Sequence, residues 1–270
     1  MDEKSPQFVI KKILDVGVDH PLVNRVMLQF CDIADSGFIN LDQEQKDEFK
    51  KVLWECTNDL LKAEESVTNY LTIEDAAIAK IASPDGVKHQ AHAYSFEDPT
   101  LTLKKHFEEF LFRAVIAVRR TFKVASIVFK KEIRGPEDLK KELNRCLPSD
   151  SVHRNWIEED SSWMRDLYDL RGKAEHQVLE MSDFSVLSIE GQKPKIKLPE
   201  IKNPSSLVRQ YISVSLQNVF GYVEDMTALL LKQGCDPRAE IIQIPENERL
   251  AHKNFRYIVF LKQFLKKPGK

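Results

Sequence analysis

The sequence contains little glycine. Its 9 glycines in 270 residues are about 3% of the chain, against a usual share of about 7%. Folds that depend on many tight turns or on glycine-rich nucleotide loops are therefore disfavoured, and a helical protein is favoured. Hydrophobic residues make up 42% of the chain and charged residues 30%, which is enough apolar material for a sizeable core.

Cysteine is also sparse, and its four positions are far apart. They are Cys31, Cys56, Cys146 and Cys235, and no two of them form a CxxC pair. This spacing excludes a zinc ribbon and argues against a disulfide framework. Free thiols at this density are typical of a reducing compartment, so we expect a cytoplasmic protein.

No apolar run reaches the length of a membrane span. The longest candidate, 111–129, is interrupted by Arg113, Arg119, Arg120 and Lys123, whereas a spanning helix needs about 20 mostly apolar residues. The first residues, MDEKSPQF, are acidic and lack the apolar stretch of a secretory signal. We therefore expect no membrane contact through a spanning segment.

Positive charge is scarce in the first part of the chain and abundant afterwards. Residues 1–100 carry 10 Lys/Arg and 19 Asp/Glu, a net charge of −9, whereas residues 101–270 carry 30 and 23, a net charge of +7. A basic region of this kind can meet a phosphate backbone. Charges that segregate on a solvated helical surface explain the same numbers, and both interpretations stay open.

Apolar residues at helical spacing predict a mainly α-helical fold, a helical bundle with an added N-terminal helical segment. The expected helices cover 20–35, 41–70, 100–134, 137–146, 151–170 and 204–233. Residues 183–201 show a hairpin-like pattern, and the C-terminal part mixes β-branched and aromatic residues typical of short strands. We therefore also predict a small β-hairpin or sheet.

Residues 83–99 indicate a loop and a domain boundary, because they contain two prolines, a glycine and no sustained period. We predict an acidic N-terminal helical region over 1–95. A helical domain over 96–270 then carries the hairpin as an insertion and ends in the short strands.

The sequence predicts neither a metal nor a cofactor. Residues 32–43 resemble a calcium-binding loop in which Asp32 would be the first ligand. The third position needs a side-chain oxygen but is Ala34, and the twelfth needs a bidentate carboxylate but is Gln43. We interpret this segment as a helix–turn–helix connection.

His89 and His92 form an HxxH pair with no third ligand at a recognisable spacing, so we interpret them as loop residues. The common nucleotide-binding and hydrolase motifs, GxxxxGK[ST], GxGxxG, GxSxG and HExxH, are absent from the sequence.

The strongest candidate for chemistry is the segment LRGKAEH at the end of a predicted amphipathic helix. Arg171 is followed five positions later by His176. A guanidinium binds phosphate oxygens in a bidentate manner, and an imidazole can act as general acid or base. In a purely structural alternative, Arg171 pairs with Glu175 and His176 caps the helix end, where the helix dipole favours it.

This segment resembles the R-x4-6-H motif of the HEPN superfamily (higher eukaryotes and prokaryotes nucleotide-binding domain). The resemblance covers about residues 100–235 and implies a bundle of four or five helices. It also implies that two protomers bring their motifs together, and many members cut RNA without a metal. Arg171 would then bind the scissile phosphate and His176 would move protons. The family usually has a polar residue after the Arg, where this sequence has Gly172.

The resemblance therefore predicts a metal-independent endoribonuclease that acts on RNA as a homodimer. It also suggests a toxin or defence role with an antitoxin-like protein partner. The alternative is a non-catalytic helical module that binds a protein or a nucleic acid. The tail from Arg249 to Lys270 has seven Lys/Arg and no acid. Its aromatics either contact RNA or an anionic membrane, or pack into the core.

Overall fold

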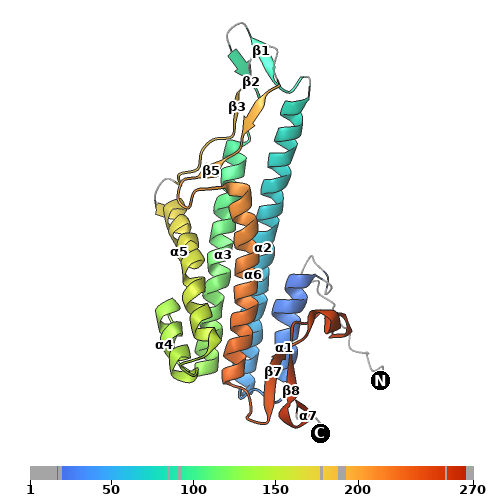
Figure 1. The fold of residues 1–270 in the computed structure, drawn as a ribbon, viewed down its shortest axis with the longest axis vertical. Helices are drawn as coiled ribbons and strands as arrows, with labels where there is room; N and C mark the ends of the chain where they lie inside the picture. The colour runs from blue at the N-terminus through green and yellow to red at the C-terminus, as the bar shows by residue number, and fades with distance from the viewer. Residues whose placement is uncertain are drawn as a thin grey trace, which may run out of the picture.

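The computed structural model describes residues 17, 20–83, 85–90, 93–176, 179–187, 193–252 and 254–265. Long helices that lie side by side form an elongated bundle, and successive long helices run in opposite directions (Figure 1). The long helices of the bundle are α2 (Gln43–Ala82), α3 (Thr100–Phe129), α5 (Val152–His176) and α6 (Val208–Gln233).

Short antiparallel hairpins lie near the upper end of the bundle in Figure 1. The first pairs β1 (Lys88–Gln90) with β2 (Ala93–Ser95), and the second pairs β3 (Ser185–Leu187) with β4 (Lys195–Lys197). In a third pair, β5 (Glu200–Ile201) lies against β6 (Ser206–Leu207), which leads directly into α6.

The opposite end of the bundle holds α4 and the elements closest to the two chain ends (Figure 1). Helix α4 joins α3 to α5. The π-helix η1 and helix α1 precede α2, and the strands β7 and β8 pair after α6, with the 3-10 helix η2 between them. Their bounds are α4 (Pro136–Cys146), η1 (Val23–Leu28), α1 (Gln29–Asp35), β7 (Ala239–Gln243), η2 (Glu246–His252), β8 (Tyr257–Leu261) and α7 (Lys262–Leu265).

Helix α3 is the central helix of the bundle, because its contacts with α2, α5 and α6 are more extensive than those of any other long helix. Apolar residues on several sides of α3 are almost completely buried. They include Leu103, Phe107, Phe110, Leu111, Val115, Val118 and Phe122. The core that they form also contains buried residues of α2, α5 and α6. The hydrophobic effect of this shared core holds the long helices together.

Helix α2 begins with a capping box inside the segment that resembles a calcium loop. The Gln45 backbone N–H donates to Asp42 Oδ1 at 2.9 Å, and the Asp42 N–H donates to Gln45 Oε1 at 3.1 Å. This pair satisfies backbone donors that a helix start otherwise leaves open. In the described part of the chain, no three His, Cys, Asp or Glu side chains gather closely enough to hold a metal ion.

The prediction of a mainly α-helical fold with small antiparallel sheets is confirmed. Several local expectations are wrong. The helix expected over 100–134 ends at Phe129, and the helix expected over 204–233 begins at Val208, because residues 206–207 form β6. Residues 83–99 contain the β1–β2 hairpin rather than only a loop, and the helix expected over 41–70 continues to Ala82. The strands of that hairpin have three residues each, too few for an alternating pattern to be recognised in the sequence.

The division into regions 1–95 and 96–270 stays a prediction. Helix α2 lies within the first region, and α3 and α6 lie within the second, yet all three contribute to one hydrophobic core. None of the helices built from described residues is long and apolar enough to cross a membrane.

Part of the charge asymmetry is compensated between neighbouring helices. Helix α2 carries five Lys and nine Asp/Glu, a net charge of −4, and α3 carries six Lys/Arg and two Glu, a net charge of +4. Across their interface, Asp59 pairs with Arg113 at 3.3 Å and with Arg120 at 3.5 Å, and Glu55 pairs with Arg120 at 2.5 Å. The acidic N-terminal part therefore neutralises some of the basic residues that follow it.

Two leucines of α3 provide a matched test of this packing. Leu111 is fully buried, and Leu101 is 83% exposed. We expect Leu111→Ala to lower the free energy of unfolding by about 2–5 kcal/mol, because it removes apolar contacts and leaves a cavity. Leu101→Ala should change it by less than about 0.5 kcal/mol. Urea denaturation followed by circular dichroism measures both values, and equal effects would contradict the central position of α3.

Candidate functional site

Arg171 and His176 lie in the last two turns of α5 and share one neighbour. Arg171 Nη2 donates to Glu175 Oε1 at 2.5 Å, and His176 Nε2 lies 3.5 Å from Glu175 Oε2. The Arg171 side chain is only 18% exposed, whereas that of His176 is 77% exposed. Glu175 thus connects the two candidate residues in the order arginine, carboxylate, histidine. The pairing of Arg171 with Glu175, expected from the i, i+4 spacing, is confirmed.

Arg171 also contacts helix α3, which brings aromatic residues next to the motif. The carbon Cζ of Arg171 lies 5.8 Å from the ring centroid of Phe112, and that of Arg113 lies 5.4 Å from the same centroid. Arg119 lies 5.4 Å from the ring centroid of Tyr168 on α5. These five residues, which we call the α3–α5 face, combine three guanidinium groups with two aromatic rings. Phe112 was not among the site residues predicted from the sequence.

Among the side chains that the structure describes, ion pairs balance two of the three guanidinium groups of the α3–α5 face. Glu175 neutralises Arg171, and the buried Asp59 binds Arg113, while the Arg119 side chain is exposed. Burial raises the pKa of the Tyr168 hydroxyl, and the nearby guanidinium groups of Arg119 and Arg171 oppose this rise. An anion that approaches this face meets Arg119 directly and competes with Glu175 for Arg171.

Gly172, the departure from the family pattern, has no packing role in the fold. Helix α5 continues through it to His176, and a Cβ atom at this position would meet no other atom within 4 Å. A Cβ atom at position 172 would therefore fit without any displacement of neighbouring atoms.

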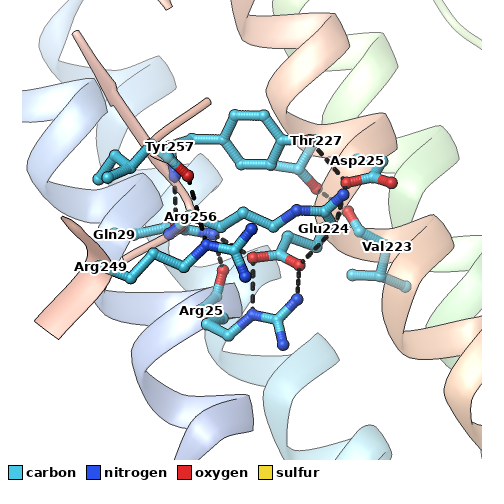
Figure 2. Close-up of polar contacts among 10 residues, drawn as sticks. Arg25, Gln29, Val223, Glu224, Asp225, Thr227, Arg249, Arg256 and Tyr257 are labelled. Atoms are coloured by element: carbon cyan, nitrogen blue, oxygen red, sulfur yellow. Dashed lines mark hydrogen bonds and ion pairs between the residues drawn. The ribbon is translucent and has the colours of Figure 1, made fainter. Parts of the chain in front are cut away.

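A second cluster of charged residues, absent from the sequence analysis, surrounds the fully buried Glu224 of α6 (Figure 2). Arg25 of η1 binds both carboxylate oxygens, with Nε at 3.0 Å from Oε1. Gln29 Nε2 donates to Oε1 at 3.0 Å, and Arg256 Nη1 donates to Oε2 at 3.1 Å. Glu224 thus accepts hydrogen bonds from residues that precede α2 and from a residue that follows β7. We call Glu224 and its partners Arg25, Gln29 and Arg256 the terminal clasp.

Gln29 and Asp225 extend the terminal clasp. Gln29 Oε1 accepts hydrogen bonds from the backbone N–H of Arg256 at 2.8 Å and of Tyr257 at 3.1 Å. Asp225 Oδ1 lies 2.8 Å from Arg256 Nη1 and accepts a hydrogen bond from the Tyr257 hydroxyl at 2.7 Å. Burial raises the pKa of Asp225, against the effects of Tyr257 and Arg256. These contacts connect α1 and β8 to α6.

A cleft of about 360 Å³ lies beside the terminal clasp, between α6 and the β7–β8 hairpin. Its apolar lining comes from Ala228, Leu229 and Ile241. Its charged groups pair with one another, since Asp225 binds Arg256 and the rim residue Lys232 lies 3.4 Å from Glu240. His153 of α5 also lines the cleft, together with the charged residues Asp225, Lys232 and Arg256.

The remaining sequence candidates lie away from the α3–α5 face or outside the described residues. In the C-terminal tail, Phe255 is buried and Tyr257 stacks against Phe30 with ring centroids 6.3 Å apart, so these aromatics pack into the fold. His89 lies on β1, but its side chain and the whole of His92 are outside the described residues.

Comparisons with known proteins identify no relative. No protein-family model matches the chain, and we found no significant match among curated proteins or solved structures. The HEPN resemblance therefore stays a prediction.

The terminal clasp makes a clear prediction for stability. Replacement Glu224→Gln should lower the free energy of unfolding by about 3 kcal/mol, because the partly buried Arg25 and Arg256 would lose their shared carboxylate. The matched control is Glu240→Gln, which removes the carboxylate that pairs with Lys232. Glu240 is 36% exposed, unlike the buried Glu224, and its replacement should cost less than about 1 kcal/mol. Urea denaturation measures both, and an equally small effect of the two substitutions would contradict a structural role for the clasp.

Proposed function

We propose that this helical protein is a metal-independent endoribonuclease in which Arg171 and His176 act on RNA. One observation carries the proposal. Both residues contact Glu175 at the end of α5, and Arg171 also lies against Phe112 within a face of arginines and aromatic rings. Guanidinium groups next to aromatic rings are a common means of binding the phosphates and bases of RNA.

The proposed reaction needs one proton acceptor, one proton donor and one phosphate-binding group. The ribose 2′-hydroxyl loses its proton and attacks the adjacent phosphorus atom, while the bond from phosphorus to the 5′-oxygen breaks. The products are a 2′,3′-cyclic phosphate and a 5′-hydroxyl. The exposed imidazole of His176 either takes the proton of the 2′-hydroxyl or protonates the leaving 5′-oxygen, and solvent water makes the other proton transfer. Arg171 stabilises the charge on the non-bridging oxygens.

Glu175 has a defined place in this proposal. Its carboxylate holds Arg171 in the free protein, so a phosphate must displace it or share the guanidinium with it. Because a guanidinium has five donors, it can contact a phosphate while it keeps one bond to Glu175. In the same proposal the protein is cytoplasmic and forms a homodimer, and an antitoxin-like protein controls it. These last three statements extend the family resemblance and the expectation from the free cysteines.

A specific observation favours a second candidate function, a non-catalytic module that binds a protein or nucleic-acid partner. Arg171 is paired with Glu175 and is largely covered. A guanidinium that a carboxylate already neutralises has less charge to offer a transition state. In this alternative, the ion pair stabilises the end of α5, and the α3–α5 face binds without cleaving.

Cleavage of mixed RNA substrates in the presence of EDTA separates the two candidates. We expect the wild-type protein to leave 2′,3′-cyclic phosphate ends without any metal. His176→Ala should reduce the rate by about 100-fold or more, because it removes a general acid or base. Arg171→Ala should reduce the rate by a similar factor through lost charge stabilisation.

The matched control is His153→Ala, which removes an exposed histidine at the other end of the same helix and should leave the rate unchanged. Circular dichroism of each variant verifies folding. Full activity of both His176→Ala and Arg171→Ala, or no cleavage by folded wild-type protein, would contradict the proposed enzyme. The second of these results would favour the binding module.

A further inference from the structure

Helix α3 presents an outward stripe in which Phe112 lies among cations. Lys105, Phe112 and Arg119 follow one another at intervals of seven residues and are all exposed. Seven residues are close to two helical turns, so the three side chains lie in one line that extends over about 21 Å. Lys123, also exposed, follows Arg119 by one turn. One exposed acid, Glu109, lies near the middle of this stripe.

The ring of Phe112 is the point at which this stripe meets the candidate site. Phe112 is 39% exposed, and the guanidinium groups of Arg113 and Arg171 lie within 6 Å of its centroid. Asp59 binds Arg113, and Glu175 binds Arg171. Both guanidinium groups lie over the ring at cation–π distances and are held by carboxylates, and part of the Phe112 side chain remains open to solvent.

We propose that Phe112 is the platform on which an unpaired base of the substrate stacks, so that the site takes single-stranded rather than duplex RNA. The inference rests on the proposed RNA substrate of the same site. An aromatic ring can stack on any base, but a base inside an RNA helix is paired and stacked on its neighbours and does not expose its face.

The surrounding charges suit the backbone of that strand. A nucleotide whose base lies on Phe112 would have its phosphates close to Arg171, whose Cζ lies 5.8 Å from the centroid of the same ring. Farther along α3, the exposed Arg119 and Lys123 offer contacts to neighbouring phosphates, and Lys105 does so in the other direction. A single strand can follow such a line of cations because its backbone is flexible. Phe112 is thus a positioning residue that places one phosphate next to Arg171 and His176.

Binding of a short 2′-O-methyl oligonucleotide tests this inference separately from cleavage, because the blocked 2′-oxygen cannot attack phosphorus. Fluorescence anisotropy compares the single strand with the same oligonucleotide annealed to its complement. We expect the wild-type protein to prefer the single strand. Phe112→Leu should weaken single-strand binding about fivefold or more, since it removes the π-face but keeps an apolar side chain.

Two further variants control this experiment. Phe112→Trp retains a stacking surface and should bind the single strand at least as tightly as the wild type. Val214→Ala removes a 55% exposed apolar side chain from α6 and should bind like the wild type. The proposed stacking on Phe112 would be contradicted if Phe112→Leu bound the single strand as tightly as the wild type. It would also be contradicted if the wild type bound single strand and duplex with equal affinity.

The outcomes also separate this inference from the proposed reaction. Phe112-dependent binding without cleavage of natural RNA would support the platform and contradict the ribonuclease. Cleavage of single strand and duplex at equal rates, unaffected by Phe112→Leu, would support the ribonuclease and contradict the platform. Neither binding nor cleavage by the folded protein would contradict both.

Discussion

The burial of α3 is the constraint on which the rest of this structure depends. Its large apolar residues, such as Phe107, Phe110 and Leu111, are completely buried, and each contributes about 1.5–3 kcal/mol when it leaves water. A helix that is apolar on several sides must be surrounded, and α2, α5 and α6 surround it. This packing leaves one outward stripe, so it decides which side chains of α3 remain available for binding. It also brings α5 close enough for Arg171 to contact Phe112.

The long helices could be predicted from the sequence because their apolar periods extend over many turns. The period of α3 indicated its start at Thr100 and the burial of Phe107, Phe110 and Phe122, although the helix ends at Phe129 rather than near residue 134. The short hairpins were harder to predict, since strands of two or three residues contain too little alternation. The packing of α2 along α3 was not predicted either. The loop-like composition of residues 83–99 suggested a boundary, whereas the buried residues on both sides of it form one core.

The candidate site could be predicted only where its contacts are local. The pair of Arg171 and Glu175 follows from a spacing of four residues on one helix. Phe112 lies on another helix, and nothing in its own segment distinguishes it from core phenylalanines until the neighbouring helices are placed. The terminal clasp is the extreme case, because Arg25 and Glu224 are 199 positions apart. An acidic residue such as Glu224 within the apolar stripe of a helix is a weak signal for such a cluster, because the stripe does not indicate which residues will bind the carboxylate. The contacts of the clasp connect segments that are far apart in the sequence, and RNA binding is proposed only for the α3–α5 face.

The most direct test of the proposed RNA-binding face is to locate the residues that crosslink to RNA. Photo-crosslinking of single-stranded RNA that contains 4-thiouridine, followed by mass spectrometry of the peptides, locates the contact without assuming catalysis. We predict crosslinks within residues 100–129 and 163–176, the parts of α3 and α5 that form the face, and their loss in Phe112→Leu. Crosslinks confined to η1, α1 and the β7–β8 hairpin, around the terminal clasp, would contradict it.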